Sequence, residues 1–250
     1  MRVLINASNL HVGGGVQVAC SFITELAKLF ESNNDKDISI VCSSAVRSNL
    51  DDMFDESRFA EFSILDVYGI KKLSDNEKKI FNGYDVCFTV FGPFYFNINV
   101  KKHICGFAQP WIAYPDNDVY PKLSFLNRYK TKLKFIIQSF IFKRYDMLVV
   151  EQSHVKRALL KYGYKSEKVE VVSNCYSSVF DDESKWEAIN FERDSDQCTI
   201  TLGFIGRPYT HKNIEILKDV DLILKEKHNL NCDFIFTFSD KKLHHRKLQK

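Results

Sequence analysis

Short apolar runs alternate with segments of helical periodicity along residues 1–176 of the chain. The run at 2–7, RVLINA, has the length and continuous apolarity of a buried parallel strand. In the segment 16–30, Val18, Phe22 and Leu26 recur at the spacing of an amphipathic helix. Further strands are predicted at 37–43, 60–67, 85–93, 103–111, 146–152 and 168–174, and further helices at 122–145 and 153–163. This alternation predicts an α/β fold, a Rossmann-like doubly wound parallel sheet.

The alternation is interrupted at residues 177–197, which contain seven acidic residues and little periodicity. We interpret this segment as a linker that ends a first domain at residue 176. The pattern resumes with a strand at 198–206, a helix at 213–228 and a strand at 232–239. Residues 198–250 are therefore expected to begin a second Rossmann-like domain that the chain leaves incomplete.

Composition narrows the class of protein. Of 250 residues, 45% are apolar and 27% charged, with a net charge of +3, which is typical of a globular protein rather than one that coats nucleic acid. A surface that interleaves aromatic and basic residues, as nucleic-acid binding needs, is not evident. The chain has neither a signal peptide pattern nor an apolar run of 18 residues, so we expect a cytoplasmic location. Its seven cysteines form no CxxC motif and are expected to be buried, reduced thiols.

Three glycines, Gly13, Gly14 and Gly15, lie between the first predicted strand and the first predicted helix. A loop without Cβ atoms brings backbone N–H groups close to an anion at a helix N-terminus, so this glycine loop (Gly13–Gly15) is a candidate phosphate site. The alternative is a tight turn that binds no ligand. A nicotinamide fingerprint fits poorly because Val18 occupies the place of its third glycine, and a P-loop is excluded because no Gly-Lys-Ser/Thr follows.

Two cations follow the first strand of the second domain. Arg207 comes directly after that strand, and Lys212 lies near the start of the next helix. A guanidinium fork and an ammonium group that converge at the carboxyl end of a strand suit two linked phosphates. The alternative is a solvated basic turn.

Four segments then carry a resemblance to one family. GFIGRPYTHKNIEIL (203–217) resembles the opening of the second domain in retaining glycosyltransferases of family 4, whose pattern is a strand, Gly-Arg, four residues, Lys and a helix. RVLINASNLHVGGGVQ (2–17) resembles the family's first strand and glycine loop. MLVVEQSHVKRALLKYGYKSEKVEVVSN (147–174) is similar to the end of its first domain, and GFAQPWIAYP (106–115) to a stretch in bacterial surface-polysaccharide members.

The resemblance implies two Rossmann-like domains that face each other across a cleft, the GT-B architecture. It implies a nucleotide-sugar donor on the second domain, a saccharide or lipid-linked acceptor on the first, retention of anomeric configuration, and no cofactor or metal. Arg207 and Lys212 would bind the donor diphosphate and stabilise the charge on the leaving nucleotide. The glycine loop would approach the same diphosphate from the opposite wall.

The chain departs from the family pattern at two places. The family's paired glutamates, E-x7-E, are absent, so the chain resembles a truncated member. A companion chain could supply the missing half; alternatively the chain is a catalytically dead module that binds acceptor, membrane or partner. Where the family often has a histidine near the reacting sugar, this chain offers Gln109 and Trp111, with His103 upstream as a further acceptor-side candidate or a simple edge residue.

The predicted helix at 122–145 contains seven Lys or Arg residues and no acidic residue. Its apolar residues Leu126, Tyr129, Leu133, Ile137 and Phe140 share one helical face. A basic amphipathic helix of this kind binds anionic membrane surfaces, which would suit a peripheral enzyme at the inner face of the plasma membrane. The alternative is a connector helix that packs its apolar face on the sheet and leaves its basic side solvated.

Overall fold

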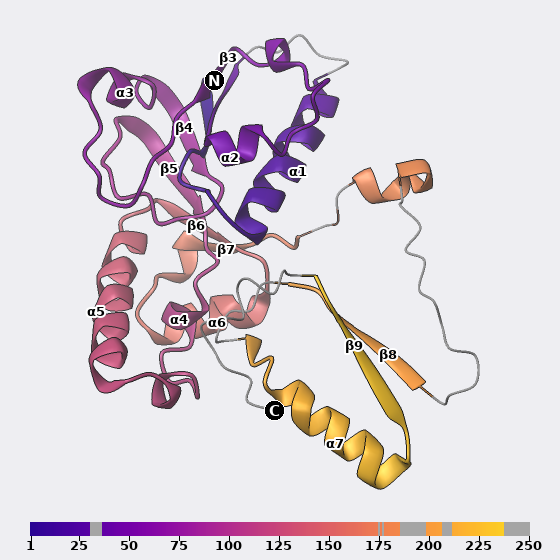
Figure 1. Cartoon of the computed structure of the whole chain (residues 1–250). Helices are drawn as coiled ribbons and strands as arrows, with labels where there is room; N and C mark the ends of the chain where they lie inside the picture. The colour runs from indigo at the N-terminus through magenta and orange to yellow at the C-terminus, as the bar shows by residue number, and fades with distance from the viewer. Residues whose placement is uncertain (31–36, 175, 177, 186–198, 207–211, 238–250) are drawn as a thin grey trace. The chain divides into compact units, whose positions relative to one another are not determined.

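The computed structural model of the chain describes residues 1–30, 37–174, 176, 178–185, 199–206 and 212–237. The chain divides into two compact units, Met1–Lys185 and Trp186–Lys250. Figure 1 shows the elements of each unit along the chain.

The first unit is built on a parallel sheet, and its described residues contribute seven strands. These are β1 (Val3–Ala7), β2 (Ile38–Cys42), β3 (Glu61–Ile64), β4 (Tyr84–Thr89), β5 (Val100–Gly106), β6 (Met147–Val150) and β7 (Val169–Val171). They lie in the order β3-β2-β1-β4-β5-β6-β7, and every neighbouring pair is parallel. The predicted Rossmann-like α/β fold is confirmed. The strand order reverses between β1 and β4, which is where open sheets of this type bind ligands.

Helices cover both faces of this sheet (Figure 1). They are α1 (Gly14–Leu29), α2 (Ser44–Arg47), α3 (Asp75–Lys79), α4 (Pro110–Ala113), α5 (Phe125–Phe142) and α6 (Ser153–Lys161). Ile23 of α1 packs with Ile5 in one buried cluster, and Phe142 of α5 and Leu159 of α6 pack with Leu148 in another. Right-handed crossovers that advance in opposite directions from the centre of a sheet place their helices on opposite faces.

Helix α5 connects β5 to β6, so it runs from the carboxyl edge of the sheet back to the amino edge. The predicted helix at 122–145 is thus observed, shorter at both ends. Its N-terminal turn lies nearest the edge where the candidate site residues gather.

The first unit ends inside the segment 177–197 that we expect to be a linker. Two 3₁₀ helices, Ser178–Asp181 and Glu183–Lys185, belong to it. Ser178 donates a hydrogen bond to the carboxylate of Glu25 in α1, so this part of the segment is attached to the first unit. Residues 186–197 lie outside the described residues, and the linker stays a prediction.

The second unit contains β8 (Thr199–Phe204), α7 (Ile216–His228) and β9 (Asn231–Phe236). The two strands are parallel, with Thr199 opposite Asn231 and Phe204 opposite Phe236. Asn229 ends α7 in the left-handed conformation, with φ of 51°, as is common after helices. This β-α-β arrangement follows the predicted elements and has the connectivity of a Rossmann-like domain.

Four cysteines, Cys20, Cys42, Cys87 and Cys105, are buried and unbonded, as predicted. Burial raises the pKa of the Cys20 thiol to about 11 and that of Cys42 to about 12, because a thiolate is poorly solvated there. Cys232 is half-buried, and Cys175 and Cys198 lie outside the described residues.

Candidate functional site

The glycine loop lies at the carboxyl end of β1, beside the reversal of strand order. Helix α1 begins at Gly14, and Gly13 precedes it with φ of 78°, a conformation that favours glycine. None of the described side chains caps this end of α1, and its first turn contains no acidic residue. A Cβ atom at Gly14 would meet no described residue within 4 Å, so the space at Gly14 is open, whereas one at Gly15 would contact Leu10 and Phe91. The N-terminus of this 16-residue helix therefore presents its positive dipole end without a side-chain cap, and the Val16 N–H donates to the Gly13 carbonyl at 3.2 Å.

Two side chains, those of Asn9 and His11, fix the segment that leads into the glycine loop. The Asn9 side chain donates a hydrogen bond to the Phe91 carbonyl at 2.8 Å, which joins the loops after β1 and β4. His11 stacks on Tyr68, with ring centroids 4.0 Å apart, and its Nε2 lies 2.9 Å from the Val67 carbonyl. Our sequence reasoning missed both side chains; their only signal was the polar stretch SNLH between the strand and the glycines.

A carboxylate next to His11 is also held in place. Asp66 Oδ1 lies 3.5 Å from His11 Nδ1, and it accepts a hydrogen bond from the Ser44 backbone N–H at 3.0 Å. The hydrogen bond from the Ser44 hydroxyl is the main reason that the pKa of Asp66 lies below its ordinary value. A charged carboxylate thus stabilises the loop from the side of β3.

In the second unit, the candidate cations follow β8. Gly206 has φ of 145°, and its N–H donates a hydrogen bond to Thr237 Oγ1 at 3.1 Å, which fixes the chain just past the strand end. Lys212 is exposed and precedes the first residue of α7, Ile216. Arg207 lies outside the described residues, so its pairing with Lys212 stays a prediction.

The three acceptor-side candidates lie in different surroundings. Gln109 is half-buried directly after the carboxyl end of β5 and provides the N-terminal cap position of α4. Trp111 is half-buried: its ring stacks on Phe135 with centroids 5.4 Å apart and meets Tyr120 edge to face at 5.0 Å. Trp111 thus joins α4 to α5, and Gln109 is left nearest the edge of the sheet.

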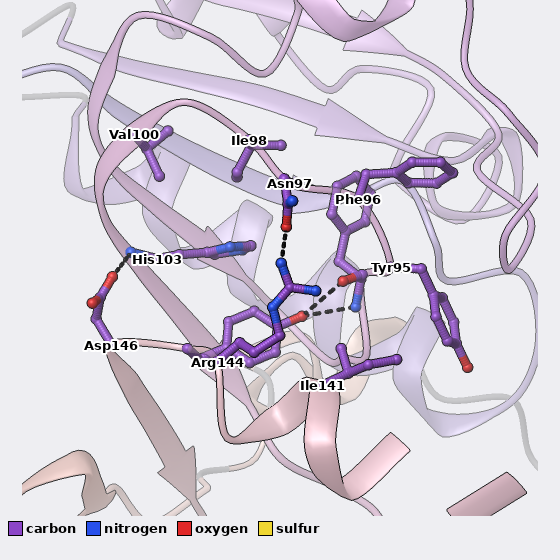
Figure 2. A pocket seen from close by; sticks show the side chains of 11 residues that line it. Tyr95, Phe96, Asn97, Ile98, Val100, His103, Ile141, Arg144 and Asp146 are labelled. Atoms are coloured by element: carbon purple, nitrogen blue, oxygen red, sulfur yellow. Dashed lines mark hydrogen bonds between the residues drawn. The ribbon is translucent and has the colours of Figure 1, made fainter. Parts of the chain in front are cut away.

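His103 lies within β5, where it lines a pocket of about 230 Å³ (Figure 2). Its Nε2 is 2.9 Å from Thr89 Oγ1, and its backbone N–H donates to Asp146 Oδ2 at 2.8 Å. Burial lowers the pKa of His103 to about 4, against a smaller opposite effect of Asp146. The ring is therefore neutral at physiological pH. Arg144, on the other side of this pocket, donates a hydrogen bond to Asn97 (Figure 2).

A chain of buried polar groups connects His103 to the end of β1. Asn6 donates its side-chain N–H to Thr89 Oγ1 at 3.2 Å, and Thr89 contacts the His103 ring. Asn6 Oδ1 accepts two hydrogen bonds from Ser8, one from its backbone N–H at 3.1 Å and one from its hydroxyl at 2.7 Å. Asn6, Ser8 and Thr89 are fully buried. Such satisfied networks fix strand ends in one arrangement, which here holds the start of the loop before the glycines.

A larger cavity of about 450 Å³ lies on the α1 side of the sheet. Its walls are mainly apolar and include Phe22 of α1, Phe88 of β4 and Val149 of β6. Among the described residues, no three His, Cys, Asp or Glu side chains lie close enough together to hold a metal ion. No helix in the part of the chain that the structure describes is long and apolar enough to cross a membrane.

The chain resembles known proteins in its three-dimensional structure and not in its sequence. No family model matches the chain, and no curated protein matches it. Among solved structures, Anabaena Alr3699/HepE in complex with UDP and glucose matches with a TM-score of 0.53 at 11% identity. HepE in complex with UDP-glucose matches with a TM-score of 0.52 at 12% identity. The chain shares the fold of HepE.

Both comparisons cover 98% of this chain and 65% of the HepE chain. The shared part includes the first unit and the described elements of the second. At this identity the likeness to HepE establishes the fold, in agreement with the observed α/β sheet.

Proposed function

We propose that this chain acts in glycosyl transfer from a nucleotide-sugar to a hydroxyl of a polysaccharide or lipid-linked saccharide. The observation that carries the proposal is the open N-terminus of α1 behind the glycine loop, at the strand-order reversal. This arrangement suits a diphosphate. Support comes from HepE, whose structures of the same fold hold UDP with glucose, or UDP-glucose.

In this proposal, the glycine loop and Lys212 bind the donor diphosphate together with Arg207. The bond between the anomeric carbon and the phosphate oxygen breaks, and negative charge grows on the departing nucleotide. Cations and helix N–H groups that are fixed before the reaction stabilise this charge more than they stabilise the bound donor, which lowers the barrier. The acceptor oxygen forms the new bond, and its proton leaves with the nucleotide diphosphate.

The resemblance to family 4 supports a retaining, metal-independent reaction. Gln109, at the carboxyl edge of β5, is the acceptor-side candidate best placed to contact a saccharide. His103 and Trp111 contribute to the same side by holding β5 and α4.

Titration with UDP-glucose, followed by thermal unfolding, tests donor binding. A ligand at 100 times its dissociation constant stabilises the native state by about 2.7 kcal/mol. Gly14→Val should abolish this gain without unfolding the protein, because the space at Gly14 is empty. Asn76→Val, on the exposed surface of α3, is its control and should bind normally.

The cations are tested in the same way. Arg207→Ala and Lys212→Ala should each remove donor stabilisation and any transfer, whereas Lys218→Ala, an exposed lysine of α7, should change neither. Unchanged binding and transfer in both cation variants would refute their assignment. If no nucleotide-sugar stabilises the protein, the catalytically dead module becomes the better description. Stabilisation by NAD instead would favour an oxidoreductase.

A further inference from the structure

Helix α5 packs on the first unit with one face and exposes an opposite face that is apolar. Gln138 and Phe142 are its buried residues, and Phe135 and Ile141 pack beside them. The opposite face is apolar and exposed. Between 48% and 83% of each of its residues is solvent-accessible, and these residues are Phe125, Leu126, Tyr129, Leu133, Ile136, Ile137 and Phe140. A helix on a globular protein normally turns its apolar side inward, so an outward apolar stripe indicates a surface that binds something.

Basic residues border this apolar stripe on both sides. At about 100° per residue, Lys130 and Lys134 follow one border and Arg128 and Lys132 follow the other. Residues 125–142 contain no acidic residue. Within the described part of the chain, none of these four cations forms an ion pair, although Lys132 Nζ lies 5.1 Å from the centroid of the Tyr120 ring. Their aliphatic stems can extend the apolar surface while the charges reach outward.

We propose that the outer face of α5 docks on an anionic lipid membrane, with the helix parallel to the surface. The apolar stripe would enter the acyl boundary, and the two rows of cations would contact the lipid headgroups. At 1.5 Å per residue, the 18-residue helix provides a contact about 27 Å long. A nucleic acid would use the cations but not the stripe, and a purely apolar protein partner would use the stripe but not the cations. The inference does not depend on the proposed glycosyl transfer.

Vesicle sedimentation with the full chain tests this surface. We expect binding at low salt to vesicles of phosphatidylglycerol and phosphatidylcholine in equal parts, and no binding to phosphatidylcholine alone. Binding should weaken as salt rises, because the Debye length falls to about 3 Å at 1 M. The apolar contact then acts without most of the electrostatic attraction.

Paired variants separate the two contributions. Lys130→Gln with Lys134→Gln should weaken binding about 30-fold, and Leu133→Ser with Ile137→Ser at least about tenfold. The matched controls are Lys72→Gln with Lys102→Gln, and Met53→Ser with Ile70→Ser, all exposed residues outside α5. These controls should bind as the unaltered chain does. All substituted side chains are exposed, and circular dichroism should show unchanged secondary structure.

Three results would overturn the proposal. One is failure to bind anionic vesicles at low salt. A second is an equal loss of binding in the control variants, which would place the contact elsewhere. The third is a dimer in solution that Leu133→Ser with Ile137→Ser dissociates while vesicle binding is unchanged, which would assign the stripe to a second copy of the chain.

Discussion

His103 should make the stability of the first unit depend on pH. Its pKa is about 4 in the folded chain and about 6.5 when unfolded. Between these values, the unfolded chain binds a proton at His103 and the folded chain does not. Acidification therefore favours unfolding, and the stabilisation that the neutral ring provides is complete above about pH 6.5 and is lost as the pH falls towards 4.

The size of this change in the free energy of unfolding follows from the shift in the pKa of His103. A difference of about 2.5 pKa units corresponds to about 3 kcal/mol over the whole range, of which about 2 kcal/mol falls between about pH 7 and pH 5. The cause is the site described above: the ring is buried between Thr89 and the pocket of Figure 2, and Asp146 offsets the burial only in part.

Urea unfolding at a series of pH values, compared between the unaltered chain and His103→Gln, measures this contribution. Glutamine can still contact Thr89 but does not titrate in this range. Between about pH 7 and pH 5, we expect the free energy of unfolding of the unaltered chain to fall by about 2 kcal/mol more than that of His103→Gln. Curves that stay parallel would show that His103 titrates equally in both states, and the reasoning from its burial would be wrong. Other histidines are common to both proteins and cancel in the comparison.

Two further predictions concern packing. Gly106→Ala should destabilise the chain by more than about 3 kcal/mol in urea unfolding, because the new Cβ would lie 1.9 Å from the Val90 carbonyl oxygen; Gly14→Ala, which meets nothing, is its control, and similar losses in both would contradict the close strand approach. Tyr145→Phe should cost about 1–3 kcal/mol, because the buried Phe94 N–H, now 2.8 Å from the hydroxyl, would lose its acceptor. An unchanged free energy of unfolding would mean that this N–H finds another partner.

The sequence predicted the alternating elements well because each depends on local apolar patterns. The strand at 2–7 and the helix from 16 are recognisable from side-chain periodicity alone. The surroundings of His103 could not be predicted in this way. Its partners Thr89 and Asp146 come from other elements, and only the parallel pairing of β4, β5 and β6 brings them together.

The same limit applies to α5. Periodicity identified its apolar stripe, and the ordinary expectation is that such a stripe faces the sheet. Instead, a polar residue, Gln138, faces inward, where its amide donates a hydrogen bond to the Tyr95 hydroxyl at 2.7 Å. This hydrogen bond satisfies one end of the amide, while Gln138 Oε1 is buried without a hydrogen-bond partner among the described residues. A tertiary contact of this kind leaves no trace in the helical pattern. The position of Trp111 likewise depends on its stacking on Phe135, a contact between separate helices.

The direction of α5 has a consequence for the way a substrate could approach. The helix runs roughly antiparallel to the strands, so if it rests flat on a bilayer, the strands also lie along the bilayer plane. Helix α1 lies on the other face of the sheet from α5, so the glycine loop at its start would then lie further from the headgroups than α5 by about one sheet layer, about 10 Å. A sugar carried on a lipid would therefore have to extend out of the leaflet to reach the glycine loop.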